Sequence, residues 1–352
     1  MRASWLLPEG NEGAGRWVPA DVNFDSGTVA LLDAESEPPY LVPALVDCHC
    51  HGVDGLDVMD GEGAAVGARL RSLGVEWFLP TTITAAWGQL RSALMPLRSG
   101  FPGFAGVHLE GPFINPKRAG AQPKDAVQEP SIEALERGLG DLMDLVRIVT
   151  LAPEMPGGLE LTAALAQRGV RVSAGHTDAD CETLIRAKEA GLSRMTHFYN
   201  AMRPFHHRDL GSVGFGLANE ITCELIYDRQ HVCPEAARLL WERRGPRGVV
   251  GISDGTALSG APDGKQTEMW GHTVVKRDGC VRLQDGTLAG SCVTMADVFR
   301  NLWQDIGPAG AVLACSLNPR ADLGLPEAAL WLVVNEEGEI TETLEGNLAR
   351  RR

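Results

Sequence analysis

The sequence lacks the features that would direct it to nucleic acid or to a membrane. Positive charge is scarce: 32 Lys and Arg stand against 46 Asp and Glu, so the net charge is −14, whereas binding to nucleic-acid phosphates needs an excess of cations. No apolar run approaches the roughly 20 residues that cross a bilayer. Pro and Gly are scattered, which argues against long disorder. We therefore expect a globular protein with no nucleic-acid or membrane partner.

A secretion signal and a disulfide pattern are also missing. The segment 1–10 has only two adjacent Leu before a Pro, far short of the roughly 7–15 apolar residues of a signal peptide. The eight Cys include no CxxC pair, and Cys48 and Cys50 are too close for an ordinary disulfide. This pattern predicts free, buried thiols in a reducing cytoplasm.

What the sequence does contain is an alternation of short apolar runs and amphipathic stretches. The apolar runs predict strands at 44–48, 75–80, 104–109, 145–151, 170–173, 194–198, 223–227 and 248–252. Helices are predicted between them at 64–72, 89–97, 131–142, 159–168, 178–190 and 234–243. Eight strands alternating with helices indicate an α/β protein with a (β/α)₈ TIM-type barrel; at this level a doubly wound open sheet is the alternative.

Both ends of the chain have a β-rich pattern. Apolar runs occupy 16–24 and 28–32 near the start and 331–334 and 339–344 near the end. The stretch 272–283 has the pattern of a hairpin turning at Asp278-Gly279. The simplest arrangement packs the two ends together as a small β-sandwich domain. We therefore predict that residues 1–43 and 328–352 form this domain and that 44–327 form the barrel.

Residues suited to chemistry follow the predicted strands at their carboxyl ends. They are His49, His51, Glu110, His176, His197 and Asp254. His49 and Asp254 are 205 residues apart in the chain, about 29 for each of seven strand-to-strand steps, which suits a compact βα unit. A barrel would bring all six to the mouth where barrel enzymes carry their active sites.

Imidazoles and carboxylates that converge in this way suit a divalent transition metal. His49 and His51, two residues apart in an extended strand, point to one side and can reach one ion, while Glu110 could bridge to a second ion held by the other two histidines. Asp254 could accept a proton from metal-activated water and pass it to a leaving group. Each residue alone is commonly an ordinary polar or turn residue; six of them at five strand ends favour a site.

These residues lie in segments that resemble the N-acetylglucosamine-6-phosphate deacetylase family of the amidohydrolase superfamily. The segments, in family order, are LVPALVDCHCHGVDGLDVMD (41–60), GVHLEGPFINPKRAGAQP (106–123), VSAGHTDAD (172–180), THFYNAMRPFHHRDLGSVG (196–214), ISDGTALSGAPDG (252–264) and GTLAGSCVTMADVFRN (286–301). HLEGPF, THFYNAM and GTLAGS are specific to this family. The resemblance implies a (β/α)₈ barrel with a small β domain, and hydrolysis of the acetamide of a 6-phosphorylated amino sugar to acetate and glucosamine 6-phosphate.

The resemblance also implies a catalytic aspartate at Asp254 and a principal metal. The ligands implied for that metal are Glu110, His176 and His197, and His49 and His51 are retained for a second ion. We expect one or two divalent ions per subunit. Zinc or iron is the expected ion, with manganese and cobalt as alternatives, because His and carboxylate ligands accept all four.

The substrate contacts implied by the resemblance are Asn200, Ala201 and His231, with phosphate bound by Arg208. A neighbouring subunit can contribute to phosphate binding in this family, so a homodimer is implied. Gln122 stands where the family usually has a substrate-binding His; it can still form hydrogen bonds with the sugar but cannot be cationic.

Two further departures concern the residues around the substrate histidine and the end of the chain. Arg229 replaces a usual Gly, and it either adds charge near the phosphate or points to solvent. The end of the chain lacks the usual GKxADL-like stretch, so a reduced small domain is expected.

Three functional hypotheses follow. The first is a deacetylase of N-acetylglucosamine 6-phosphate. The second, motivated by Gln122 and Arg229, is an amidohydrolase acting on another N-acylated amino sugar or a cyclic amide. The third is a non-catalytic sugar-phosphate-binding protein, against which the presence of every expected metal ligand and of Asp254 argues.

Overall fold

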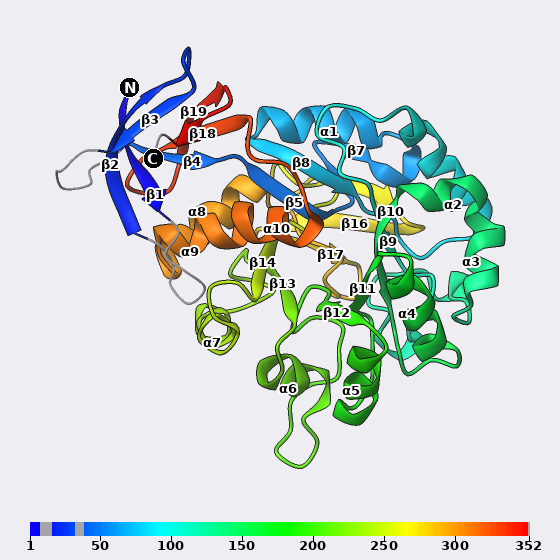
Figure 1. Ribbon diagram of the computed structural model, residues 1–352. Helices are drawn as coiled ribbons and strands as arrows, with labels where there is room; N and C mark the ends of the chain where they lie inside the picture. Colours follow the sequence, from blue (N-terminus) through cyan, green and yellow to red (C-terminus); the bar gives the residue numbers. More distant parts are fainter. Residues whose placement is uncertain (8–15, 32–38, 351–352) are drawn as a thin grey trace.

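A computed structural model describes residues 1–7, 16–31 and 39–350 (Figure 1). In Figure 1 a small sheet lies at the left, where both termini are found, beside a larger part in which helices surround the strands.

Parallel strands form the centre of the larger part. β9 to β14 pair in chain order in one six-stranded sheet, and β5 pairs with β8. The strands are β5 (Leu45–Cys50), β8 (Val75–Pro80), β9 (Val107–Glu110), β10 (Val146–Leu151), β11 (Arg171–Ala174), β12 (Leu192–Met195), β13 (Thr222–Ile226) and β14 (Val249–Ile252). Isolated backbone bridges join Phe78 to Phe104 and Cys50 to Gly255, so the two sheets touch at both edges. The predicted α/β class is confirmed.

Each predicted strand overlaps an observed one. The prediction for 194–198 is the poorest, because β12 already ends at Met195. The reason is local: His197 has φ 32°, a left-handed conformation that an extended strand does not contain.

Helices connect successive strands on the outside of the molecule (Figure 1). They are α1 (Gly63–Ser72), α2 (Trp87–Leu94), α3 (Ile132–Leu139), α4 (Gly158–Gln167), α5 (Cys181–Glu189), α6 (Gly211–Ala218), α7 (Pro234–Arg244), α8 (Met295–Asp305), α9 (Pro308–Val312) and α10 (Asn318–Leu323). The helix predicted from 178 begins later, at Cys181, because Asp180 is its N-cap and accepts a hydrogen bond from the Thr183 N–H.

The small sheet combines the two ends of the chain. Its strand order is β19-β18-β4-β1-β2-β3-β20. The bounds are β1 (Arg2–Leu7), β2 (Arg16–Asn23), β3 (Thr28–Leu31), β4 (Tyr40–Pro43), β18 (Leu330–Val334), β19 (Ile340–Glu345) and β20 (Ala349–Arg350). A sandwich of two sheets was expected, whereas hydrogen bonds join these strands in one sheet, because β1 pairs antiparallel with β2 and parallel with β4.

A third sheet lies between β14 and α8 in the chain. It contains β15 (Gln266–Met269), β16 (His272–Arg277) and β17 (Cys280–Leu283). The predicted hairpin at 272–283 is confirmed: Arg277 faces Cys280, and both turn residues, Asp278 and Gly279, have positive φ. The turn between β15 and β16 places Trp270 in the pocket described below.

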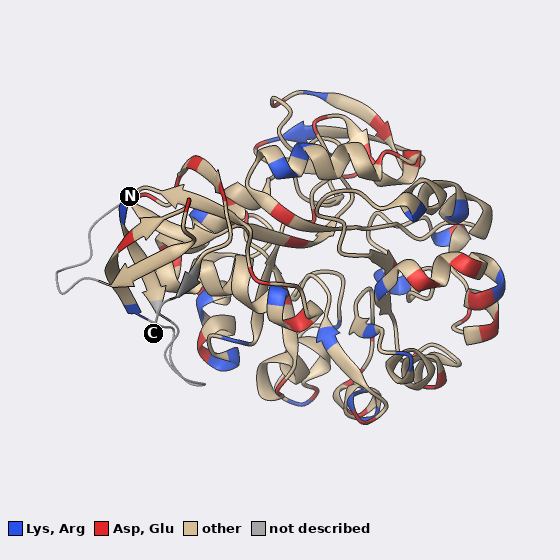
Figure 2. Cartoon of the chain, turned by 45° about the horizontal axis from the view of Figure 1, so that its top comes forward, with Lys and Arg blue, Asp and Glu red and all other residues tan. Residues whose placement is uncertain are grey.

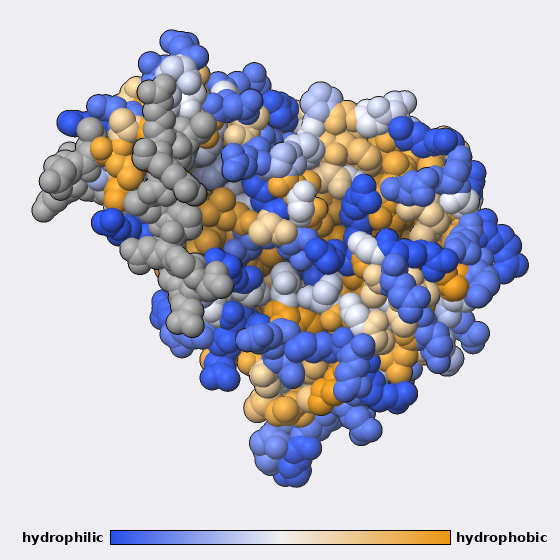
Figure 3. Space-filling model, in the orientation of Figure 1, coloured by the Kyte–Doolittle hydropathy of each residue, from blue (hydrophilic) through white to orange (hydrophobic). Residues whose placement is uncertain are grey.

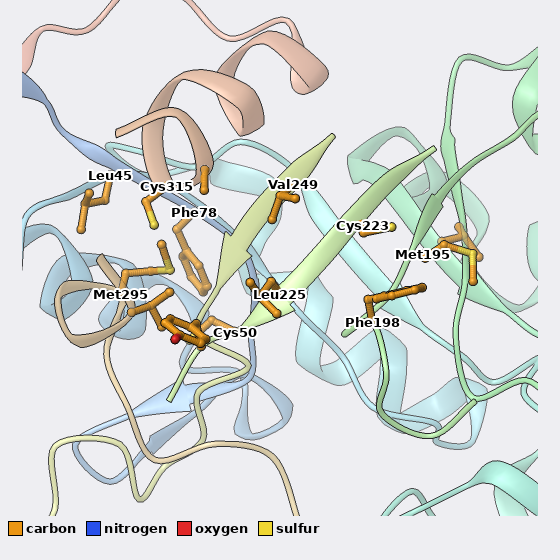
Figure 4. Packing of buried hydrophobic residues seen from close by; sticks show 14 of the residues in the cluster. Leu45, Cys50, Phe78, Met195, Phe198, Cys223, Leu225, Val249, Met295 and Cys315 are labelled. Atoms are coloured by element: carbon orange, nitrogen blue, oxygen red, sulfur yellow. The ribbon is translucent and has the colours of Figure 1, made fainter. Parts of the chain in front are cut away.

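The main core fills the space between the strands and the covering helices. Figure 4 shows part of it, where Leu45, Cys50 and Phe78 pack near Met295 of α8 and Cys315. Cys48 and Cys50 are both buried with no disulfide partner, as predicted for core thiols.

Charged residues lie mostly on the outer surface. Lys and Arg are mixed with Asp and Glu along the outer helices in Figure 2. The Arg98–Asp141 pair is an example in which both side chains are exposed. Within the described residues, no helix combines the length and apolarity needed to traverse a bilayer.

Candidate active site and metal centre

The six residues at the strand ends come together in space. Glu110 is the last residue of β9, His49 lies in β5, and His51 follows that strand directly. The other three each lie two residues beyond a strand: His176 after β11, His197 after β12 and Asp254 after β14. All six are buried.

Glu110, His176 and His197 form one compact group, called here the Glu110 trio. Glu110 Oε1 lies 3.2 Å from His176 Nε2 and 3.1 Å from His197 Nε2. The two Nε2 atoms are 3.1 Å apart. Three ligand atoms that face one point at these distances match the one-carboxylate, two-imidazole set of divalent metal sites.

His49, His51 and Asp254 form a second group, the His49 trio. The two Nε2 atoms are 3.2 Å apart, and each lies 3.2 Å from Asp254 Oδ1. Glu110 lies between the two groups, since its Oε1 is 3.5 Å from His49 Nε2 and its Oε2 is 3.5 Å from His51 Nε2.

Three of the four imidazoles are held by an acceptor at Nδ1. His51 Nδ1 contacts the Thr81 carbonyl at 3.1 Å, and His176 Nδ1 contacts the Arg118 carbonyl at 2.8 Å. His49 Nδ1 contacts a carboxylate, described next. Carbonyl and carboxylate oxygens accept only, so each Nδ1 carries a proton and Nε2 is the atom left to bind an ion, the arrangement that metal-binding histidines use. The donor set therefore fits a divalent ion.

The residues behind His49 were missed by sequence reasoning. Glu224 Oε2 lies 3.1 Å from His49 Nδ1, and Glu224 Oε1 accepts a 2.8 Å hydrogen bond from Arg194, which also pairs with Asp322. Glu224 and Arg194 are fully buried. Their only signal in the sequence is a charged residue inside an apolar strand, which implies a buried partner but does not name it.

His108 has a structural role. It can form a further ligand group with His49 and Glu224, but its Nδ1 contacts the Cys48 carbonyl at 3.0 Å and its Nε2 contacts Thr150 Oγ1 at 2.7 Å. Both ring nitrogens are therefore engaged. Burial, together with the neighbouring His49, lowers the pKa of His108 to about 3.

The carboxylates of the site are held in the ionised form. Burial opposes the charge of Glu110, but the imidazoles of His49 and His176 outweigh it and hold its pKa well below the usual range. The same balance lowers the pKa of Asp254, where His49 and His51 outweigh burial. An ionised Asp254 in the pocket is in the form needed to accept a proton.

The backbone is strained at three of the six positions. His176, His197 and Asp254 have φ of 47°, 32° and 47°, in the left-handed region that residues other than Gly uncommonly adopt. Such strain is concentrated in functional sites, where the surrounding fold maintains it. Here it turns each side chain out of its strand and toward the common centre.

A pocket of about 380 Å³ opens above the two trios. Of the expected substrate contacts, Gln122, Asn200, Ala201 and His231 line it. His231 is fixed by Asp228, whose Oδ2 lies 2.6 Å from its Nδ1. Lys117, Arg118 and Trp270 also line the pocket and were not singled out from the sequence.

Arg208 does not line this pocket. It is exposed, in the segment before α6 that protrudes at the bottom of Figure 1 and has a hydrophilic tip in Figure 3. Its Nη1 contacts His207 Nε2 at 2.8 Å.

Arg229 is exposed, which agrees with the solvent-facing alternative considered from the sequence. It lies outside the pocket lining and binds α8, with Nε 2.7 Å from Asp305 Oδ2 and Nη2 3.0 Å from Gln304 Oε1.

Comparisons with known proteins agree with this geometry, although no family model matches the chain. The chain is 36% identical to an N-acetylglucosamine-6-phosphate deacetylase of Bacillus subtilis, over 93% of this chain and 92% of that one. It is also 36% identical to an N-acetylgalactosamine-6-phosphate deacetylase of Escherichia coli O157:H7, over 92% and 89%. A solved structure of the Mycobacterium smegmatis N-acetyl-D-glucosamine-6-phosphate deacetylase in complex with N-acetyl-D-glucosamine-6-phosphate superimposes with a TM-score of 0.84 at 28% identity, covering 98% and 97%.

Proposed function

The chain belongs to the N-acetylglucosamine-6-phosphate deacetylase family, and from this we propose that it hydrolyses N-acetyl-D-glucosamine 6-phosphate to glucosamine 6-phosphate and acetate. The observation that carries the proposal is the Glu110 trio beside an ionised Asp254 in one pocket. A non-catalytic binding protein would need neither the converging ligands nor the carboxylate.

The Glu110 trio would hold the principal divalent ion, and the His49 trio supplies ligands for a second. Zinc or iron suits these ligands, and manganese or cobalt can also bind to them. When bound, the ion supplies Lewis acidity that polarises the amide carbonyl and makes water more acidic.

Asp254 performs the proton transfers of the proposed reaction. Its carboxylate accepts a proton from the attacking water as the C–O bond forms. It then delivers that proton to the amide nitrogen as the C–N bond breaks, so acetate and the free amine leave. Burial of Asp254, with about 7% of its surface exposed, keeps bulk water from competing for the proton.

Recognition of the sugar phosphate falls to side chains around the pocket. Asn200, Ala201 and His231 line it in the same chain. Because Arg208 lies on the protruding segment instead, we propose a homodimer in which Arg208 of one subunit reaches the phosphate bound by its neighbour.

We also propose that the parallel strands close into a barrel and that the two ends of the chain form a separate small domain. The edge bridges Phe78–Phe104 and Cys50–Gly255 support closure of the parallel strands into a (β/α)₈ barrel. Residues 44–327 would form this barrel, and 1–43 with 328–352 the small domain. We place the protein in the cytoplasm, in keeping with eight free thiols.

The test is acetate release by the purified protein loaded with Zn²⁺, Fe²⁺, Mn²⁺ or Co²⁺ in turn. N-acetylglucosamine 6-phosphate should be hydrolysed much faster than N-acetylglucosamine, since only the former offers an anion to His231 and Arg208. Absence of acetate from the phosphorylated sugar with all four ions would reject the proposal.

N-acetylgalactosamine 6-phosphate is the second candidate substrate. The 36% identity to the E. coli O157:H7 protein equals that to the B. subtilis protein. The two sugars differ only in the configuration of one hydroxyl. The ratio of kcat/KM for the two phosphates, measured side by side, decides between them.

A further inference from the structure

Gln122 occupies a position in the pocket that the family resemblance assigns to substrate contact, yet its side chain is engaged elsewhere. Its Nε2 donates a 2.5 Å hydrogen bond to Glu110 Oε2, and its Oε1 accepts a 2.7 Å hydrogen bond from the backbone N–H of Thr84. The residue is only 5% exposed.

The orientation of the amide follows from its two neighbours. A backbone N–H can only donate, so it requires the amide oxygen. With the amide oxygen taken by Thr84, the amide nitrogen is the atom that faces Glu110 Oε2, and it donates the hydrogen bond to that oxygen. Gln122 is therefore a bridge with a fixed direction, from the segment after β8 to the end of β9.

The frame around this bridge is tight. A Cβ at Gly111 would lie 2.2 Å from Thr84 Oγ1, so the Thr84 segment packs directly against the residue after Glu110. Thr84 is fully buried. The donor on Gln122 thus holds Glu110 Oε2 against a rigid support, while Glu110 Oε1 faces His176 and His197.

We propose that Gln122 is a positioning residue for Glu110, and through it for the metal held by the Glu110 trio, rather than a substrate contact. This rests on the proposed function only in assuming that the Glu110 trio binds a metal ion. Groups that orient metal ligands in this way affect metal affinity by about 10–100-fold.

The experiment measures Zn²⁺ affinity by competition with a chromophoric chelator, without substrate. A His51→Gln background breaks the His49 trio. Of the two groups of three that remain among the described residues, His49 with His108 and Glu224 has both His108 nitrogens engaged, so the Glu110 trio is the group open to an ion. In it, Gln122→Met removes both hydrogen bonds at similar volume, and Gln122→Glu keeps the acceptor for Thr84 but loses the donor to Glu110. We expect both to weaken Zn²⁺ binding about 10–100-fold. The matched control is Lys117→Met, which alters the same loop and pocket without touching Glu110, and should change Zn²⁺ affinity less than twofold.

Steady-state kinetics supply the second measurement, in the otherwise unaltered chain. At saturating Zn²⁺, Gln122→Met should recover most of kcat with KM within about threefold of the parent. Unchanged Zn²⁺ affinity with a KM that stays raised at saturating metal would overturn the proposal and return Gln122 to substrate binding. Circular dichroism confirms that each variant is folded. Because the Zn²⁺ titration needs no substrate, its outcome is independent of whether the proposed deacetylation is found.

Discussion

The two sides of the pocket differ in burial and in what holds their side chains. On the metal side, the two trios are buried at strand ends, and His49, His51 and His176 are each held from behind. On the recognition side, Asn200, Ala201 and His231 are half-buried, and Arg208 is fully on a surface segment. The chemical groups are thus fixed before substrate arrives. Among the recognition groups His231 is held in the same way, by Asp228, whereas Arg208 lies on an exposed segment.

The largest effect on the metal side is expected from removing Asp254, the proposed general base and acid. Asp254→Asn should retain metal on the Glu110 trio and lose about 10²–10⁴-fold in kcat, the usual contribution of general acid–base catalysis. Acetate release and elemental analysis on one sample check both. Asp141→Asn, a surface carboxylate paired with Arg98, is the control and should keep the parent kcat. Parent-like turnover in Asp254→Asn would remove Asp254 from its role.

The support behind the metal side can be tested by removing the cation that pairs with Glu224. Arg194→Met leaves the buried Glu224 without its cation and should lower the free energy of unfolding by about 3–5 kcal/mol. Arg98→Met removes one partner of an exposed pair and should cost about 0–1 kcal/mol. Urea unfolding of both variants measures the contrast. Equal, small losses would show that the support behind His49 is not held as tightly as its burial indicates.

The recognition side is tested at Arg208, the cation that is proposed to bind the phosphate. Arg208→Met should lower kcat/KM for the 6-phosphorylated sugar about 10–100-fold, the value of a hydrogen bond between charged groups, and leave the slow reaction of the unphosphorylated sugar unchanged. Mixing Arg208→Met with Asp254→Asn subunits decides which subunit supplies Arg208. If it acts across a dimer, mixed dimers regain activity, because one of their two sites has both residues intact; no recovery would place it in its own site.

The smallest expected effect is a pH dependence on the recognition side. Burial would lower the pKa of His231, but the carboxylate of Asp228 outweighs it and raises that pKa above 6.5. His231 is cationic below its pKa, so KM for the phosphorylated sugar should be lowest there and rise about fivefold as the pH passes through it. Asp228→Asn should move this rise to lower pH. A KM that does not depend on pH, or a rise in KM that stays at the same pH in Asp228→Asn, would show that His231 does not bind the phosphate.

The same contrast explains what the sequence could predict. The metal side was accessible because strands recur regularly along the chain and six His, Glu and Asp residues coincide with their ends. All eight strands and the convergence of the six residues were predicted. The roles of Glu224 and Arg194 were not predicted. They lie within strands β13 and β12, and the position of a charged residue along its strand does not reveal which charge on the neighbouring strand it pairs with.

On the recognition side the sequence was less informative. Arg208 and Gln122 were identified by motif position, but their surroundings depend on irregular segments whose paths have no period. Arg229 shows the same limit: its partner Asp305 is 76 residues away, on α8. Residue type alone could not distinguish an ion pair with a helix from a contact with phosphate.

The small sheet has a consequence for the order in which the protein can be completed during synthesis. β4 pairs with β18, and these strands are separated by nearly the whole larger part of the chain. Until β18 has left the ribosome, β4 has an open edge and Leu41 lacks its Val333 neighbour. Such a long-range pairing forms slowly because it closes a very long loop. The nascent chain would therefore pass through a stage with a formed centre and an unfinished, association-prone edge.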